Sequence, residues 1–251
     1  MKEFIKDNLK VEVLGSRHLM GIAAANAVAK KIIELLKTKQ FVSIIFAAAP
    51  SQNEFLDELL KHDIDWTRIR AFHMDEYLNL DADAPQGFGN FLKERLFGKV
   101  SFKAVYYLNG NAADAEQECL RYADLLSQFP PDIVCLGIGE NTHLAFNDPH
   151  VADFNDPLLV KIVDLDNACR VQQVNDGCFA RIEDVPTHAL TLTIPALMNT
   201  PFAFAIVPGE KKADAVNHTL NAAVSEKYPS TILRKHPNAV LFVDDKSGAY
   251  I

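Results

Sequence analysis

The stretch "FVSIIFAAAPSQNEFLDELLK" (residues 41–61) contains the unit on which the predicted fold rests. Its first nine residues are apolar or small, which is typical of a strand buried on both faces. A polar turn follows, and apolar residues then recur at helical spacing. Ser51, with Glu54 three residues later, has the pattern of a capping box, so we predict that Ser51 caps a helix. A strand followed directly by a helix is the building unit of an α/β fold.

The same alternation continues along the chain. Further strands are predicted at residues 68–74, 104–108, 132–139, 188–194, 202–207 and 239–244, and further helices at residues 18–37, 115–129 and 210–224. The strand at 188–194 alternates apolar and polar side chains, which predicts that it is more exposed than the others. The pattern predicts a single layered α/β domain over residues 1–251, with a mainly parallel central sheet flanked by helices on both faces.

The composition limits which partners the chain can bind. Its 251 residues include 25 Lys and Arg against 33 Asp and Glu, a formal net charge of −8. An acidic surface repels phosphate backbones and anionic headgroups, so we expect no nucleic acid and no membrane as partners. A small anionic substrate is compatible with this charge, because a few local cations can set the field of one pocket.

The cysteines indicate a reducing compartment. Cys119, Cys135, Cys169 and Cys178 form no C-x-x-C pair, and their spacing matches no zinc signature. The sequence shows no secretion signal and no apolar stretch of about 20 residues that would span a membrane. We therefore predict a cytoplasmic protein without a metal site.

Polar side chains follow four of the predicted strands at their carboxyl ends. The strands that end near residues 49, 74, 139 and 207 run into "AAAPSQ", "MDEY", "GENTH" and "PGEKK". In open α/β sheets, ligands bind beyond the carboxyl ends of the strands. We therefore expect these four segments to surround one site.

Asp75 and Glu76 belong to one of these segments. Asp75 is either a turn or N-cap aspartate, or a general base, since a carboxylate partly shielded from water can take a proton from carbon or oxygen. Glu76 is either its positioning partner or a solvated side chain. The sequence alone leaves both choices open.

The loop "GIGENTHLAFNDP" (residues 137–149) places His143 among many polar groups. A lone histidine is usually a surface or packing residue. Here Gly139 permits a tight turn and close approach of a ligand to the backbone. Asn141 and Asp148 can orient the imidazole by accepting its N–H. Because an imidazole titrates at about pH 6.5, we predict that His143 both gives and takes protons.

Arg170, Lys212 and Ser51 are the candidate anion contacts. As surface residues they would simply be solvated. An arginine, however, can hold a phosphate with two parallel donors, and a lysine supplies a point charge. The helix predicted to begin near Ser51 adds free backbone N–H groups for the same anion.

Five segments carry a resemblance to a known family. They are "FHMDEYLNL", "YYLNGNA", "GIGENTHLAFNDP", "PGEKKADAV" and "PSTILRKHPNAVLFVDD", in this order. With them the sequence resembles the glucosamine-6-phosphate deaminases (isomerases) over residues 41–245. The related 6-phosphogluconolactonases have a similar glycine–histidine loop but lack its "AFN" continuation and the "MDEY" signature. The resemblance implies isomerisation of a phosphorylated amino sugar, glucosamine 6-phosphate, with loss of ammonia to give fructose 6-phosphate.

The resemblance also implies a role for each matching residue. Asp75 would be the base that moves a proton between C2 and C1, and His143 would open the pyranose ring through the ring oxygen. Asp148 stands where the family has a glutamate that supports the histidine, and Lys212 and Arg170 would hold the phosphate. No organic cofactor and no metal are implied, and a homo-oligomer is expected.

Three departures from the family pattern leave alternatives open. Asn141 replaces an aspartate, Thr142 replaces a glycine, and "AAAPSQ" replaces a glycine-rich phosphate loop, where alanine restricts positive φ. The retained Asp75 and His143 favour an active deaminase. The alternatives are a 6-phosphogluconolactonase-type hydrolase and a non-catalytic sugar-phosphate-binding protein.

Overall fold

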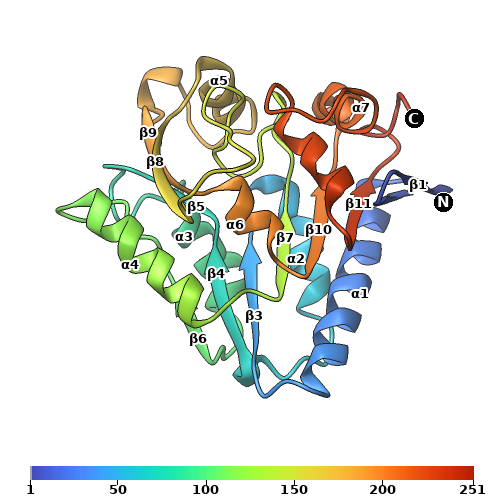
Figure 1. Ribbon diagram of the computed structural model, residues 1–251, viewed down its shortest axis with the longest axis horizontal. Coiled ribbons are helices and arrows are strands. Elements are labelled where there is room, and N and C mark those ends of the chain that lie inside the picture. Colours follow the sequence, from blue (N-terminus) through green and yellow to red (C-terminus); the bar gives the residue numbers. More distant parts are fainter. Residues whose placement is uncertain (1) are drawn as a thin grey trace.

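An eight-stranded sheet forms the centre of the protein (Figure 1). The structure is a computed structural model and describes residues 2–251. The strands of this sheet are β1 (Lys2–Lys6), β2 (Leu9–Val13), β3 (Val42–Phe46), β4 (Ile69–His73), β6 (Ala104–Tyr106), β7 (Ile133–Leu136), β10 (Phe202–Val207) and β11 (Ala239–Val243). Their order is β1-β2-β11-β10-β7-β3-β4-β6, and all neighbours are parallel except β1 and β2.

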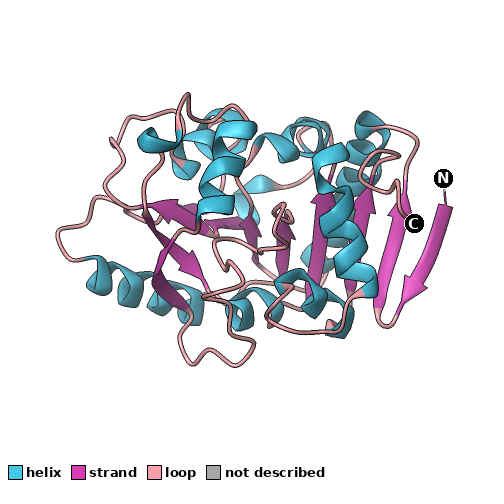
Figure 2. Ribbon diagram, turned by 90° about the horizontal axis from the view of Figure 1, so that it is seen from above, coloured by secondary structure: helices cyan, strands magenta, loops and turns pink. Residues whose placement is uncertain are grey.

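Helices cover both faces of this sheet, as Figure 2 shows from above. They are α1 (Arg17–Leu36), α2 (Asn53–Leu59), α3 (Phe88–Leu92), α4 (Ala115–Gln128), α5 (Asn167–Asn175), α6 (Ile194–Met198) and α7 (Ala213–Asn221). The predicted α/β fold with a mainly parallel central sheet is therefore confirmed. Within residues 2–251, no helix has both the length and the apolar character needed to cross a bilayer.

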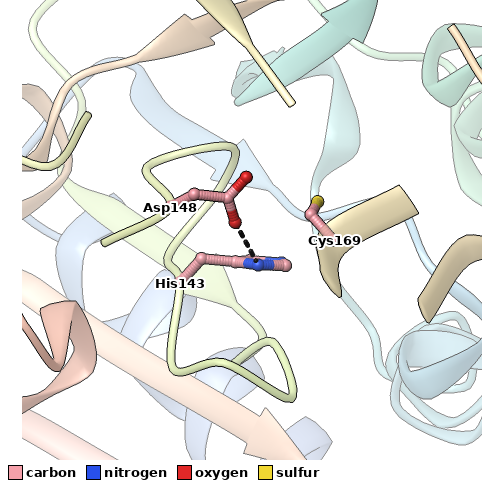
Figure 3. Close-up of side chains that lie close together, drawn as sticks. All are labelled: His143, Asp148 and Cys169. Carbon is pink, nitrogen blue, oxygen red and sulfur yellow. Dashed lines mark ion pairs between the residues drawn. The ribbon is translucent and has the colours of Figure 1, made fainter. Parts of the chain in front are cut away.

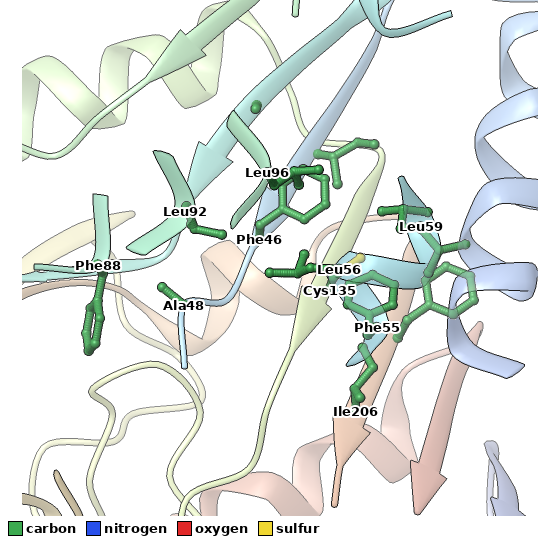
Figure 4. Close-up of a cluster of buried hydrophobic side chains, with 14 of the residues drawn as sticks. Phe46, Ala48, Phe55, Leu56, Leu59, Phe88, Leu92, Leu96, Cys135 and Ile206 are labelled. Atoms are coloured by element: carbon green, nitrogen blue, oxygen red, sulfur yellow. The ribbon is translucent and has the colours of Figure 1, made fainter. Parts of the chain in front are cut away.

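Alternate residues of the central strands fill two separate cores, which explains why these strands are apolar throughout. In β3, Ile44 and Phe46 belong to the core that includes α1 and α2, and Figure 4 shows Phe46 in one buried cluster with Leu56 and Phe55. Ile45 belongs to the other core, together with Phe72 of β4. Both faces of the central strands are therefore closed to water, which leaves the ends of these strands for a site.

The order of the strands reverses between β3 and β7. After β3 the chain adds β4 and β6 on one side, whereas β7, β10 and β11 are added on the other side. The connections that follow β3 and β7 therefore run in opposite directions. In open α/β sheets, this arrangement creates the crevice in which ligands bind.

A second, antiparallel sheet contains β5 (Asp75–Tyr77), β9 (His188–Leu192) and β8 (Val160–Asp164), in the order β5-β9-β8. β5 follows β4 almost directly, so the chain passes from the large sheet into the small one. The strand predicted at 188–194 is confirmed, but its predicted exposure is wrong. Residues 189–192 are buried, with Leu190 and Leu192 in the second core.

The predicted capping box at Ser51 does not form. Pro50–Gln52 make a 3₁₀ turn, and α2 then starts at Asn53 without a side-chain cap. Glu54 pairs instead with Arg17 of α1, at an Nε–Oε1 distance of 2.7 Å. The hydroxyl of Ser51 therefore does not cap the helix.

A buried tyrosine joins the edge of the large sheet to α4. Tyr122 is fully buried, and its hydroxyl accepts the N–H of His73 and lies within bonding distance of the carbonyls of His73 and Tyr106. We expect Tyr122→Phe to lower the free energy of unfolding by about 1–3 kcal/mol, because it leaves these buried groups unpaired. Urea denaturation would measure this. Tyr250→Phe, at a side chain that is 61% exposed, is the control, and equal stability of the two variants would contradict the expectation.

Candidate active site

A cavity opens at the carboxyl ends of β3 and β7. Five of the nine predicted site residues line it: Ser51, Asp75, Gly139, His143 and Lys212. Residues 47–49, after β3, and residues 137–139, after β7, line it as well. Polar groups from four strand ends thus meet at one place, as the sequence predicts.

Asp75 is buried in the wall of this cavity, with 7% of its surface exposed. It lies within β5, opposite Thr191 of β9, so it is not a turn or N-cap residue. Burial, and then the negative charge of Glu76, raise the pKa of the Asp75 carboxyl well above its ordinary value. Once ionised, such a carboxylate is a stronger base than one in water.

His143 is paired with a fully buried carboxylate. Its Nδ1 lies 3.0 Å from Oδ1 of Asp148. Figure 3 shows the imidazole edge-on with the carboxylate above it, so the contact is close but lacks the alignment of a hydrogen bond. Burial would raise the pKa of Asp148, but His143 and hydrogen bonds from Asn141 and the Asp166 N–H outweigh burial and lower it. Asp148 is therefore placed to stabilise a positive imidazolium.

Gly139 is required by the packing of His143. A Cβ atom at position 139 would lie 2.3 Å from Cε1 of the imidazole, a distance that the ring could not tolerate without moving. The positive φ angles of the loop occur elsewhere, at Thr142 (72°) and Ala145 (50°). The glycine thus allows the ring to lie directly on the backbone, which is a second reason for it beside the predicted approach of a ligand.

Asn141 does not accept a hydrogen bond from the imidazole, contrary to the prediction. Its Oδ1 accepts the backbone N–H of His143 at 3.1 Å, and its Nδ2 donates to Oδ1 of Asp148 at 2.9 Å. Asn141 therefore holds the backbone of the loop and the carboxylate, and the carboxylate faces the ring.

Lys212 and Ser51 supply a cation and a hydroxyl to the same cavity. Lys212 is 7% exposed, and its burial lowers the pKa of its ammonium group, against the opposing effect of the Asp176 and Glu140 charges. The Oγ of Ser51 accepts a hydrogen bond from Nε2 of Gln52 at 3.1 Å, so its own hydrogen is free to bond a ligand. Together they suit an anionic group.

Glu76 does not line this cavity. Its carboxylate accepts the backbone N–H groups of Tyr77, Phe88 and Gly89 at 2.8–3.1 Å. It therefore anchors the start of α3, where Phe88 lines the cavity, and it places a negative charge beside Asp75. Neither alternative given for Glu76 describes it, because it is buried and its carboxylate bonds backbone N–H groups and not the side chain of Asp75.

Arg170 does not line the cavity either. Its Nη2 donates to the carbonyls of Ile182 and Val185, at 2.6 and 3.1 Å. The guanidinium therefore holds the segment that follows α5 against this helix. The structure does not place Arg170 in the predicted phosphate site, so Lys212 is the predicted cation that the cavity retains.

α5 and the segment after it contribute residues that sequence reasoning missed. Gln172, Gln173, Asp176 and Cys178 all line the cavity. The available signal was the three- and four-residue spacing of Cys169, Gln172 and Gln173, which form the buried face of α5. Burial raises the pKa of the Cys178 thiol to about 11, so it lines the cavity as a neutral group.

Two groups of side chains are close enough to share a metal ion, with ligand atoms within 4.8 Å of one another. They are His143, Asp148 and Cys169, drawn in Figure 3, and Asp148, His150 and Asp166. Both groups depend on the carboxylate of Asp148. That carboxylate already accepts hydrogen bonds from Asn141 and from the N–H of Asp166. The groups that bind the carboxylate of Asp148 are therefore N–H donors of the protein, an arrangement that suits a proton-transfer site.

Known proteins resemble this chain in sequence and in structure. The model of the family "Glucosamine-6-phosphate isomerases/6-phosphogluconolactonase" matches residues 16–242. Glucosamine-6-phosphate deaminases of Bacillus thuringiensis and Bacillus anthracis are 38% identical over 223 residues, covering 89% of this chain and 83% of theirs. A solved monomeric glucosamine-6-phosphate deaminase superposes with a TM-score of 0.86 and 26% identity, covering 96% of this chain and 99% of that one. The 6-phosphogluconolactonase of Thermotoga maritima shares the fold, with a TM-score of 0.76, 22% identity and coverages of 94% and 99%.

The contact between Gly139 and His143 can be tested directly. We expect Gly139→Ala to displace the imidazole and to lower the free energy of unfolding by about 1–3 kcal/mol, because the added methyl group overpacks the loop. Chemical denaturation and the NMR signal of the His143 Cε1–H would report the two effects. Gly15→Ala is the matched control, since a Cβ there meets nothing within 4 Å. An unchanged His143 signal in Gly139→Ala would show that the contact does not position the ring.

Proposed function

The chain belongs to the family of glucosamine-6-phosphate isomerases and 6-phosphogluconolactonases, and from this premise we propose that it converts glucosamine 6-phosphate and water into fructose 6-phosphate and ammonia. Its relatives make it an enzyme of the glucosamine-6-phosphate deaminase type. The observation that carries the proposal is that the carboxyl of Asp75 and the imidazole of His143, far apart in the chain, line one cavity beside Lys212.

The phosphate of the substrate would bind to Lys212 and Ser51, which both line the cavity. The ammonium supplies charge, and the hydroxyl, whose oxygen is held by Gln52, donates a hydrogen bond. The phosphate is remote from the reacting carbons C1 and C2, so its binding energy can be used to position them. The anionic end of the sugar thus orients C1 and C2 toward the carboxyl and the imidazole.

His143 would open the pyranose ring. The imidazole takes the proton of the C1 hydroxyl and gives a proton to the ring oxygen, while the C1–O bond of the ring breaks and an aldehyde forms. In between, the imidazole carries a positive charge, which the buried carboxylate of Asp148 stabilises at 3.0 Å. The protein ends this step in the protonation state in which it began.

Asp75 would then move a proton from C2 to C1. Its carboxylate removes the C2 proton, and the electron pair forms a C1–C2 double bond while the aldehyde oxygen gains a proton from the ammonium group of the substrate. Return of the proton to C1 leaves an iminium group at C2. Water adds to this carbon, its two protons pass to the nitrogen, and the C–N bond breaks, so that ammonia leaves as ammonium and a ketone remains. Burial of Asp75 supports this role, because it strengthens the base.

A second candidate is hydrolysis of a 6-phosphogluconolactone. It is favoured by the shared fold, since the 6-phosphogluconolactonase of Trypanosoma brucei superposes with a TM-score of 0.81 at 15% identity. Lactone opening needs activated water but no proton transfer on carbon, so it leaves the buried Asp75 without a role. Ammonia release from glucosamine 6-phosphate, compared with acid release from the lactone, separates the two. A protein that binds phosphorylated amino sugars without turnover would give neither product.

The oligomeric state stays a prediction. The resemblance led us to expect a homo-oligomer, whereas one solved relative is described as monomeric. Sedimentation of the purified protein would decide between them.

Replacing the proposed base gives the sharpest test. We expect Asp75→Asn to reduce ammonia release from glucosamine 6-phosphate by about 10²–10⁴-fold, because the amide cannot take the C2 proton. Binding of the phosphate ester, measured by calorimetry, should change little, since Lys212 and Ser51 remain. Asp57→Asn, at an exposed position of α2, is the charge-matched control and should retain activity. Full activity of Asp75→Asn would remove Asp75 from the mechanism.

The pH dependence of Asp75 has a defined sign. Its pKa is raised in the folded protein, so the ionised base appears only as pH increases through that raised value, and kcat/KM should rise over the same range. Stability should change in the opposite sense, because a raised carboxyl pKa favours folding at low pH and loses this contribution as pH increases. Asp75→Asn should therefore become more stable relative to the unmodified protein as pH is raised, as measured by urea denaturation. A constant difference would contradict the burial of an ionising carboxyl.

Gln52 should affect binding more than turnover. It is 1% exposed, and its Nε2 also donates to the carbonyl of Ile206 at 3.1 Å, so it holds Ser51 rigidly. We expect Gln52→Leu to raise KM for glucosamine 6-phosphate about 10-fold with a smaller change in kcat, because the lost orientation weakens one hydrogen bond to the phosphate. Asn53→Leu is the neighbouring control. A fall in kcat with unchanged KM would rule out this orienting role.

A further inference from the structure

We propose that Asn141 is a positioning residue whose side-chain amide bridges the carboxylates of Asp148 and Asp166, and thereby ties the His143 loop to the N-terminus of α5. The inference rests on the proposed function for its activity readout only. The bridge itself is a property of the fold and has a readout of its own.

Both hydrogens of one amide have a carboxylate within reach. The Nδ2 of Asn141 lies 2.9 Å from Oδ1 of Asp148 and 3.2 Å from Oδ2 of Asp166. An amide nitrogen carries two hydrogens, so it can serve both acceptors at once. The backbone N–H of Asp166 also donates to Oδ2 of Asp148, at 3.3 Å. Two like charges are thus held together by donors between them.

The bridge reaches the wall of the cavity through α5. Asp166 is the N-cap of this helix, and its Oδ1 accepts the N–H of Cys169 at 2.6 Å. The helix carries Gln172, which lines the cavity and accepts the backbone N–H of Glu140 at 2.7 Å. The loop of His143 and α5 are therefore joined by two hydrogen bonds, one from Asn141 to Asp166 and one from Glu140 to Gln172.

An ionised aspartate at position 141 could not form this bridge. It would offer acceptors only, and it would place three carboxylates together without a side-chain donor between them. The family pattern has an aspartate at this position, and Asp166 explains why an amide suits this chain. The titratable groups that face the bridge are His143, Asp148 and His150 from its own loop, and Asp166 and Cys169 from the start of α5.

The test is Asn141→Asp, followed across pH. Below the pKa of the new carboxyl, its O–H can replace one of the two hydrogens of the amide. Above that pKa the donor is lost and repulsion appears. We therefore expect ammonia release to fall by about 3-fold near pH 5.5 and by about 10- to 100-fold near pH 8, which is the effect of losing a hydrogen bond to a charged group. Asn155→Asp makes the same chemical change at an exposed position and should lose less than about 2-fold at either pH.

A second readout does not need activity. The melting temperature of Asn141→Asp should lie further below that of the unmodified protein at pH 8 than at pH 5.5, whereas Asn155→Asp should show no such trend. The double variant Asn141→Asp, Asp166→Asn removes one of the three carboxylates and restores one donor, so it should recover part of both losses at pH 8. If Asn141→Asp follows Asn155→Asp in melting temperature at both pH values, the bridge is overturned. If the unmodified protein releases no ammonia, the proposed function fails while the melting experiment still decides the bridge.

Discussion

The adjacency of β3 and β7, two parallel strands whose connections leave in opposite directions, is the constraint on which the site depends. Side chains fill both faces of the sheet, so its carboxyl edge is where backbone groups of two different loops can face one ligand. The loop after β3 brings Ser51 to this edge, and the loop after β7 brings His143. Asp75 reaches the same edge because β5 continues from β4, the neighbour of β3. A different strand order would separate these groups, whatever their sequence.

Burial acts against the charged forms of two groups at once. It raises the pKa of Asp75 and lowers that of Lys212, so both charges are held at a cost in folding free energy. An amino sugar phosphate carries the complementary charges, an amine that can face the carboxylate and a phosphate that can face the ammonium. Binding of such a substrate would therefore add favourable charge interactions that offset part of this cost. The same burial that weakens the fold makes the cavity selective for a ligand with charges of both signs.

The sequence predicted the large sheet because its central strands are buried on both faces and appear as continuous apolar runs. β1, β2, β5 and β8 escaped prediction, because β5 has three residues and the other three strands are interrupted by charged side chains and form no continuous apolar run. The sequence therefore left open whether Asp75 is a turn residue or a base. The cavity could be predicted in outline, from polar residues at strand ends. Arg170 could not be placed, because the direction of a guanidinium on α5 depends on carbonyls of the later segment at Ile182 and Val185.

The departures from the family pattern are best understood together with the residues that contact them. Alanine replaces glycine after β3, but Ala49 has a φ of −162°, an extended conformation that any residue adopts, so no glycine is needed there. Thr142 does adopt a positive φ, and its carbonyl accepts the N–H of Ser230, a contact that holds the strained turn in place. The side-chain amide of Asn141 donates a hydrogen bond to the carboxylate of Asp166. The substitutions at positions 141 and 142 are thus each accompanied by a contact from a distant part of the chain, and such contacts become visible only in the folded structure.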